Sequence, residues 1–124
     1  MAATLVAKET VIQRLKEVFS ITPAVVARAP GRVEVLGNHT DYNDGVVLSA
    51  AIDREVWIAI AKSPTRECKL TSTHFSDPAI VNEIVPQKGA GAWVNYPLGV
   101  YSVLKEQGYP VSPFIINHAI NYSV

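Results

Sequence analysis

The pattern of apolar and polar positions along this chain of 124 residues predicts two amphipathic helices separated by several strands. Over residues 9–20, apolar residues recur at the spacing of one helix face, with charged residues on the opposite face. The apolar positions of this face are Val11, Ile12, Leu15, Val18 and Phe19. Thr10 and Gln13 have the spacing of a capping box, which predicts that the helix starts there and ends before Pro23.

Short β-rich segments make up most of the remaining chain. The expected strands are residues 24–29, 45–53, 55–62, 68–73, 79–85 and 114–120. Asp77 and Pro78 form the expected turn between the fourth and fifth of them. The second helix is predicted over residues 93–107, ended by Gly108. Pro97 is compatible with it only if the first turn begins near Asn95.

This order of elements predicts an α+β fold. A helix, several adjacent strands, a helix and a strand indicate a mixed sheet with helices packed on it, because a regular βαβ array would alternate strictly. The final strand stops close to Val124, and we expect it to lie unfinished at a sheet edge. Residues 1–124 are therefore expected to be part of a longer protein.

Composition and charge exclude several classes of partner. Eleven basic and eleven acidic residues give no net charge, which argues against a nucleic-acid or anionic membrane surface. No stretch resembles a signal peptide or reaches the roughly 18 apolar residues of a membrane helix, so we expect a cytoplasmic protein. The single cysteine, Cys68, excludes a disulfide within the chain, and we interpret it as a small buried strand residue.

The segment of residues 29–45, A-P-G-R-V-E-V-L-G-N-H-T-D-Y-N-D-G, concentrates the candidate chemistry. Pro30 and Gly31 are expected to turn the chain, and a second turn at residues 43–45 returns it to a strand. Between them lie the permanently charged Arg32 and a mixture of donors and acceptors that suits a polyhydroxylated ligand. The polar candidates are Asn38, His39 and Asp41, although the last could equally form an Asx turn.

Three segments together resemble the galactokinase signature. They are residues 29–33 (APGRV), 37–43 (GNHTDYN) and 45–48 (GVVL), and residues 93–96 (WVNY) followed by Gly99 and Val100 resemble a second galactokinase segment. The galactokinases belong to the GHMP small-molecule kinases, and the resemblance extends from about Val11 to the last residue. It implies that residues 1–124 form the N-terminal part of the N-terminal domain of such a kinase.

The resemblance also implies a function and a set of site residues. The family transfers the γ-phosphoryl group of ATP, with Mg²⁺ bound to the nucleotide, to the anomeric hydroxyl of galactose. Arg32 corresponds to the arginine beside the reacting hydroxyl, where a fixed positive charge suits phosphoryl transfer. Residues of the sugar side are Asn38, His39 and Asp41, and residues of the nucleotide side are Trp93, Tyr96 and Thr73. Trp93 and Tyr96 could instead be core aromatics.

Two substitutions distinguish this chain from the family pattern. Asn38 replaces the usual glutamate, which exchanges a carboxylate for an amide and can shift the preference for sugar hydroxyls. Glu34 occupies a position where asparagine is common, and we assign it no chemistry. His74 and His118 are interpreted as structural, and no zinc site is expected.

The family's phosphate loop and catalytic aspartate are expected beyond residue 124. The chain therefore holds about half of an active site and is expected to be inactive alone. Two alternatives stay open: a non-catalytic sugar and ATP sensor of the same family, and a kinase for a different sugar.

Overall fold

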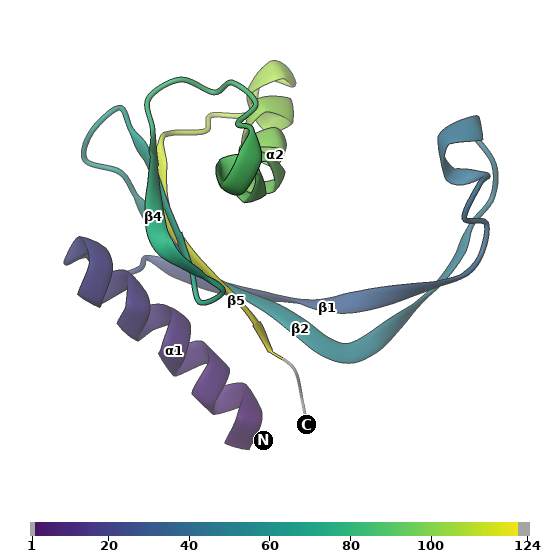
Figure 1. The fold of residues 1–124 in the computed structure, drawn as a ribbon, viewed down its shortest axis with the longest axis horizontal. Helices are drawn as coiled ribbons and strands as arrows, with labels where there is room; N and C mark the ends of the chain where they lie inside the picture. Colours follow the sequence, from purple (N-terminus) through teal and green to yellow (C-terminus); the bar gives the residue numbers. More distant parts are fainter. Residues whose placement is uncertain (1, 122–124) are drawn as a thin grey trace.

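The computed structural model describes the backbone of residues 2–121 and the side chains of residues 8–40 and 42–119. Figure 1 shows the arrangement of the elements. The helices are α1 (Ala2–Phe19) and α2 (Asn95–Glu106), with short 3-10 helices η1 (Asp41–Asn43) and η2 (Gly89–Val94). The strands are β1 (Val25–Leu36), β2 (Leu48–Lys62), β3 (Cys68–Ser72), β4 (Phe75–Val81) and β5 (Phe114–Asn121).

Within the described residues the strands form one sheet in the order β1-β2-β5-β3-β4. The pair β3 and β5 is parallel, and the other neighbouring pairs are antiparallel. Helix α1 lies on one face of the sheet and α2 on the other (Figure 1). The predicted α+β class, with a mixed sheet and helices packed on it, is confirmed.

Alternation along β5 separates two apolar cores, because successive side chains of a strand point to opposite faces. The core under α1 contains Ile115, and the core under α2 contains its neighbour Ile116. The other buried members of the first core are Val11, Leu15, Trp57, Ala59, Ala61 and Ala119. Those of the second core are Cys68, Leu70, Val81, Val94 and Leu98. Both helices thus bury the apolar faces that their sequences predict.

Cys68 is a buried strand residue, as the sequence predicts. Burial raises the pKa of its thiol, and a backbone hydrogen bond from Phe114 opposes the rise. A buried thiol with a raised pKa is a poor nucleophile, so the structure supports a packing role for this residue.

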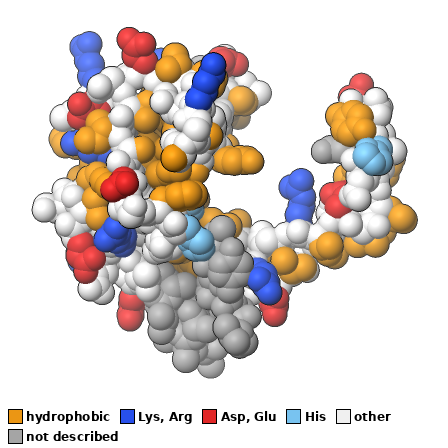
Figure 2. Space-filling view, in the orientation of Figure 1, with side chains coloured by type: hydrophobic (Ala, Val, Ile, Leu, Met, Phe, Trp, Pro, Cys, Tyr) orange, Lys and Arg blue, Asp and Glu red, His pale blue; other side chains and the backbone are white. Residues whose placement is uncertain are grey.

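Strands β1 and β2 continue past the sheet as a two-stranded ribbon, which we call the arm (residues 30–55). The arm curves away from the body of the molecule, and its tip lies on the same side of the sheet as α2 (Figure 1). Neither core includes a residue from this range among the described side chains. Figure 2 shows hydrophobic side chains along the arm, and these are exposed. They include Val33, Val35, Leu36, Val46, Leu48 and Ile52.

The first helix starts earlier than its capping pattern predicts. It begins at Ala2, so Thr10 lies inside it and does not cap it. The preceding residues include three alanines and a leucine, whose high helix propensity favours this extension. The predicted end is confirmed: Ser20 adopts a left-handed conformation and its N–H donates to the carbonyl of Lys16 at 2.8 Å.

Two predicted turns are wrong, and both contain a proline. Pro30 lies within β1, where the strand pairing shifts between Pro30 and Arg32, and Pro78 lies within β4. Both strands are at edges of the sheet, where a residue without an N–H leaves the ladder intact. The turn between β3 and β4 therefore falls before Phe75, and residues 82–85 are not a strand.

The predicted strands 45–53 and 55–62 are one continuous strand, β2, which begins only at Leu48. The final strand, β5, is central rather than at an edge, since it pairs with β2 and with β3. Helix α2 begins at Asn95, which places Pro97 in the first turn as required. Trp93 lies just before it, in η2.

Among the described residues, no helix is long and apolar enough to cross a membrane.

Candidate functional site

The tip of the arm, residues 37–47, is organised around Thr40. The Thr40 hydroxyl lies 3.0 Å from the carbonyl oxygens of both Gly37 and Val46 and donates to them. The Thr40 carbonyl accepts from the N–H of Asn43 at 3.1 Å and of Gly45 at 2.8 Å. A single residue therefore connects the two sides of the tip and sets its shape.

Glycine is required on both sides of Thr40. Gly37 has a φ of +108°, and a Cβ there would lie 2.9 Å from the Thr40 hydroxyl oxygen. A Cβ on Gly45 would lie 2.6 Å from the Cβ of Thr40. This is shorter than a normal contact between two non-bonded carbons, so the backbone of the tip would have to shift. The glycines that the sequence pattern indicates as turn residues are thus needed for close packing as well.

His39 is held within the tip by its neighbours. Its Nδ1 lies 2.9 Å from the hydroxyl of Tyr42, and the two rings meet edge to face at 6.2 Å. The Asn43 side-chain amide donates to the His39 carbonyl at 2.8 Å. Tyr42 therefore orients the imidazole and Asn43 fixes the backbone of His39, while Nε2 has no hydrogen-bond partner among the described side chains. The sequence pattern alone assigned no such role to Tyr42.

Asn38, the neighbour of His39, is exposed at the same tip. The backbone of Asp41 begins η1, but its side chain lies outside the described residues. The structure therefore brings Asn38 and His39 together and leaves the side chain of Asp41 untested.

Arg32 lies on β1, between the sheet and the tip. Its side chain is 74% exposed, and its Nε lies 4.0 Å from Oε2 of Glu34. The same Oε2 accepts a hydrogen bond from the hydroxyl of Ser49 at 2.9 Å, across the pair of strands. The other oxygen, Glu34 Oε1, is buried without a hydrogen-bond partner in the described structure. Glu34 and Ser49 are the residues beside Arg32 that sequence reasoning missed.

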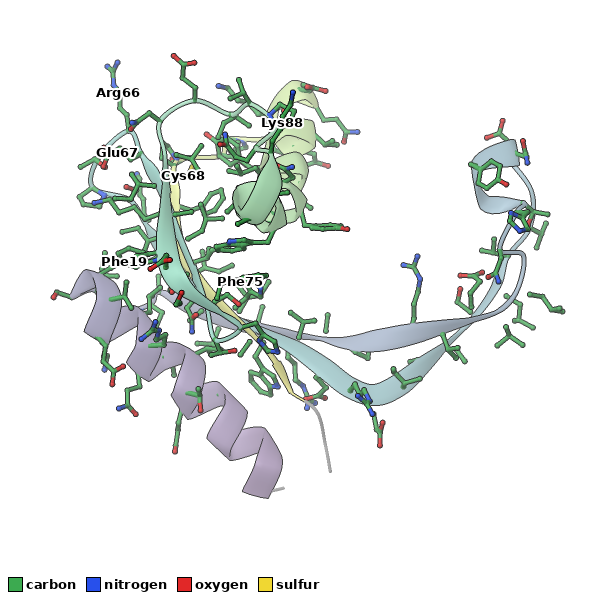
Figure 3. The ribbon with its side chains drawn as sticks, in the orientation of Figure 1. Phe19, Arg66, Glu67, Cys68, Phe75 and Lys88 are labelled. Carbon is green, nitrogen blue, oxygen red and sulfur yellow. The ribbon has the colours of Figure 1, made fainter. Side chains whose placement is uncertain are left out.

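The nucleotide-side candidates lie elsewhere, on the face of the sheet that carries α2. The Trp93 ring stacks on Phe75, with centroids 5.1 Å apart and planes 9° from parallel, and it contacts His118 at 5.4 Å. Figure 3 shows Phe75 beneath α2. The Thr73 N–H donates to the His118 carbonyl at 3.1 Å. Trp93 and Thr73 thus both contact His118, although they lie 20 residues apart in the sequence.

Tyr96 does not join this aromatic cluster. It lies in the first turn of α2 with 84% of its surface exposed. Tyr96 is therefore not a core aromatic, which contradicts the alternative interpretation of this position as part of the core. Trp93, by contrast, packs against the core under α2, as that alternative predicts.

Burial lowers the pKa of His118, and the nearby charge of His74 lowers it further. Burial therefore favours the neutral form of the His118 imidazole. Its ring supports the aromatic cluster as a packing group, in agreement with the structural role predicted for it.

Among the described residues, the surface near α2 suits a planar ring rather than phosphate groups. Trp93 and its partners offer a flat aromatic surface, which can pack against a base. Among the described residues no group of three or more His, Cys, Asp and Glu side chains is placed to hold a metal ion. The α2 N-terminus is preceded by η2 (Gly89–Val94), whose two glycines lie in a 3-10 helix rather than in an open loop at the helix N-terminus.

The arm lies within the part of the chain that matches a known family signature. Residues 13–62 match the model described as the galactokinase galactose-binding signature. This range includes the tip, Arg32, Glu34 and Ser49, and it ends before the aromatic cluster.

Curated relatives extend the similarity over most of the chain. The galactokinase of Roseiflexus sp. (strain RS-1) is 35% identical over 100 residues, covering 81% of this chain and 26% of the relative. That of Staphylococcus saprophyticus is 36% identical, covering 77% of this chain and 25% of the relative. The chain spans about a quarter of the length of these relatives.

Solved structures share the fold. The Lactococcus lactis galactokinase, crystallised with galactose, superposes with a TM-score of 0.68 at 27% identity, over 91% of this chain and 30% of that one. The Methanococcus jannaschii mevalonate kinase superposes with a TM-score of 0.59 at 22% identity, over 81% of this chain and 33% of that one, which indicates a common fold. In signature, in sequence and in fold, the chain is therefore similar to part of a galactokinase.

Proposed function

We propose that the chain forms the sugar side of a kinase that transfers the γ-phosphoryl group of ATP to the anomeric hydroxyl of galactose. The observation that carries this proposal is the match of residues 13–62 to a galactose-binding signature, because that range contains the entire arm. We further propose that residues 1–124 are the N-terminal part of the kinase's N-terminal domain. The relatives are about three times as long as this chain, in keeping with this assignment.

Three residues of the tip are proposed to bind the sugar. The orientation of His39 by Tyr42 supports a role as a fixed hydrogen-bonding group. Asn38 carries both a donor and an acceptor, so it can pair with a hydroxyl in either direction. Asp41 is proposed as an acceptor for two neighbouring hydroxyls. Vicinal hydroxyls need such a mixture, which favours a sugar over an anionic or apolar substrate.

Arg32 is proposed as the catalytic residue of this chain. Its guanidinium cannot lose its proton at physiological pH, so it can stabilise negative charge that develops near the reacting hydroxyl. The bound nucleotide supplies the phosphoryl group, and Trp93, Tyr96 and Thr73 are proposed to contact its adenine end. Magnesium is proposed to enter with the nucleotide, since no holder for it is apparent in the described part of the chain.

The test is sugar phosphorylation by the full-length protein that contains this chain. We expect galactose to be the preferred substrate in a panel of hexoses, and Arg32→Ala to lower turnover by about 10²- to 10³-fold. Arg28→Ala is the matched control, because Arg28 lies on the same strand but pairs with Glu55 at the base of the arm. Near-normal turnover in Arg32→Ala would contradict the catalytic assignment.

Two related functions are distinguished by the same measurements. A sensor of this family would bind galactose and ATP without producing sugar phosphate. A kinase for another sugar would leave galactose unphosphorylated and accept a different hexose, an outcome that Asn38 makes worth testing. The isolated chain is expected to be inactive, because the described residues offer no cradle for the phosphates.

A further inference from the structure

Among the described residues, Glu34 lies beside Arg32 and its hydrogen bonding is incomplete. Its side chain is only 24% exposed although it lies on the arm, where neighbouring side chains are largely open to solvent. Oε2 is anchored by the Ser49 hydroxyl at 2.9 Å. Oε1 is buried and has no partner in the described structure. A buried carboxylate oxygen without a donor is costly, so a donor is expected to reach it in the working protein.

The nearest cation is the guanidinium of Arg32, whose Nε lies 4.0 Å from Oε2. The two residues are two positions apart on one strand, so their side chains leave the same face. A guanidinium offers two parallel N–H groups that match both oxygens of a carboxylate. A small rotation of the exposed Arg32 side chain would direct a second N–H to Oε1.

We propose that Glu34 is a positioning residue, which holds the Arg32 guanidinium in one orientation beside the reacting hydroxyl. This inference rests on the proposed function of Arg32. An exposed arginine has many rotamers, and a charge that must be ordered during the reaction contributes less than one already in place. Ser49 supports this role, because its hydrogen bond holds the Glu34 carboxylate in place beside Arg32.

A second arginine–glutamate pair in the same strands shows what a completed version looks like. Arg28 Nη1 lies 3.1 Å from Glu55 Oε1, and the Trp57 indole donates to Oε2 at 3.0 Å. Glu55 thus has one cation and one neutral donor, each on its own oxygen. Glu34 also has one cation, Arg32, and one neutral donor, Ser49, but both lie beside the same oxygen, Oε2. Glu55 is therefore a matched control of similar exposure on the adjoining strand.

The kinetic test uses Glu34→Gln in the full-length protein, since glutamine keeps the shape and the acceptor for Ser49 but removes the charge. We expect kcat to fall about tenfold with the KM for sugar nearly unchanged, because the interaction matters in the transition state. Ser49→Ala should act in the same direction and more weakly. Glu55→Gln should leave both constants unchanged.

A double-mutant cycle shows whether Glu34 acts through Arg32. In the Arg32→Ala background, Glu34→Gln should have no further effect on kcat. An equal loss in both backgrounds, or an unchanged kcat in Glu34→Gln, would overturn the proposal. If Arg32→Ala alone keeps normal turnover, the proposed function of Arg32 fails, and the positioning role fails with it.

A second readout does not depend on activity. In the full-length protein labelled at arginine, the Arg32 Nε proton should exchange with solvent about tenfold more slowly than in Glu34→Gln. The Arg28 Nε proton serves as the internal reference and should not change between the two proteins. Equal exchange of the Arg32 proton in both proteins would refute the positioning role even if no sugar were phosphorylated.

Discussion

Strands β1 and β2 run through both the body of the sheet and the arm, yet the two regions are stabilised by different interactions. In the body, β2 lies between β1 and β5, and its side chains enter the cores under α1 and α2. Among the described residues of the arm, β1 and β2 pair with each other, and many of their apolar side chains are exposed. The arm is held by the strand ladder and by the hydrogen bonds of Thr40.

This difference explains where the candidate chemistry lies. A position that must be buried in a core accepts few polar residues, because each one needs a buried partner. The arm has no such requirement, so it can carry Arg32, Asn38 and His39 within a few residues of one another. The body contributes Trp93, which packs against the core under α2, and Thr73, whose N–H donates to the His118 carbonyl.

The largest expected contrast is in stability. Leu15→Ala, at a side chain with no exposed surface in the core under α1, should lower the free energy of unfolding by about 2–5 kcal/mol. Leu36→Ala, at a side chain 67% exposed on the arm, should change it by less than about 0.5 kcal/mol. Urea denaturation of the two variants measures both values. Equal losses would show that the arm is packed as tightly as the body.

Two glycine substitutions, one in the tip of the arm and one in the body, should differ in their effect on galactose binding. Gly45→Ala brings a Cβ within 2.6 Å of the Cβ of Thr40, so the tip must change shape. We expect about tenfold weaker galactose binding by the full-length protein, measured by calorimetry. Gly99→Ala in α2 meets nothing within 4 Å and should bind normally while stabilising the helix by about 0.5–1 kcal/mol. Unchanged galactose binding by Gly45→Ala would argue against the tip as the sugar site.

The smallest expected effect is a pH dependence that belongs to the body. Burial lowers the pKa of His118 in the folded chain below its unfolded value of 6.5, so the unfolded chain binds the proton more readily. Stability should therefore decline as the pH falls below about 6.5. Unfolding free energies at pH 7.5 and 5.5 measure the decline, which should be smaller in His118→Asn. The same decline in both proteins would assign the effect to other groups.

Much of the fold could be predicted from the sequence, because the relevant signals are local. Val11 and Leu15 identify the buried face of α1, and Asn95 and Pro97 identify the start of α2. The errors came from residues whose effect depends on their neighbours. A proline interrupts a central strand but is tolerated in an edge strand. Only the sheet order shows that β1, which contains Pro30, lies at an edge.

The candidate site shows the same division. The sequence by itself determined the resemblance to galactokinases, the dense polar segment and the glycines of the tip, because the motif is long and each residue type has a specific chemistry. Only the tertiary structure decided which groups meet: it joined Trp93 to His118 and Glu34 to Ser49, and it left Tyr96 exposed. The physical reason is that cross-strand register and sheet order determine these contacts, and neither is encoded in a local pattern.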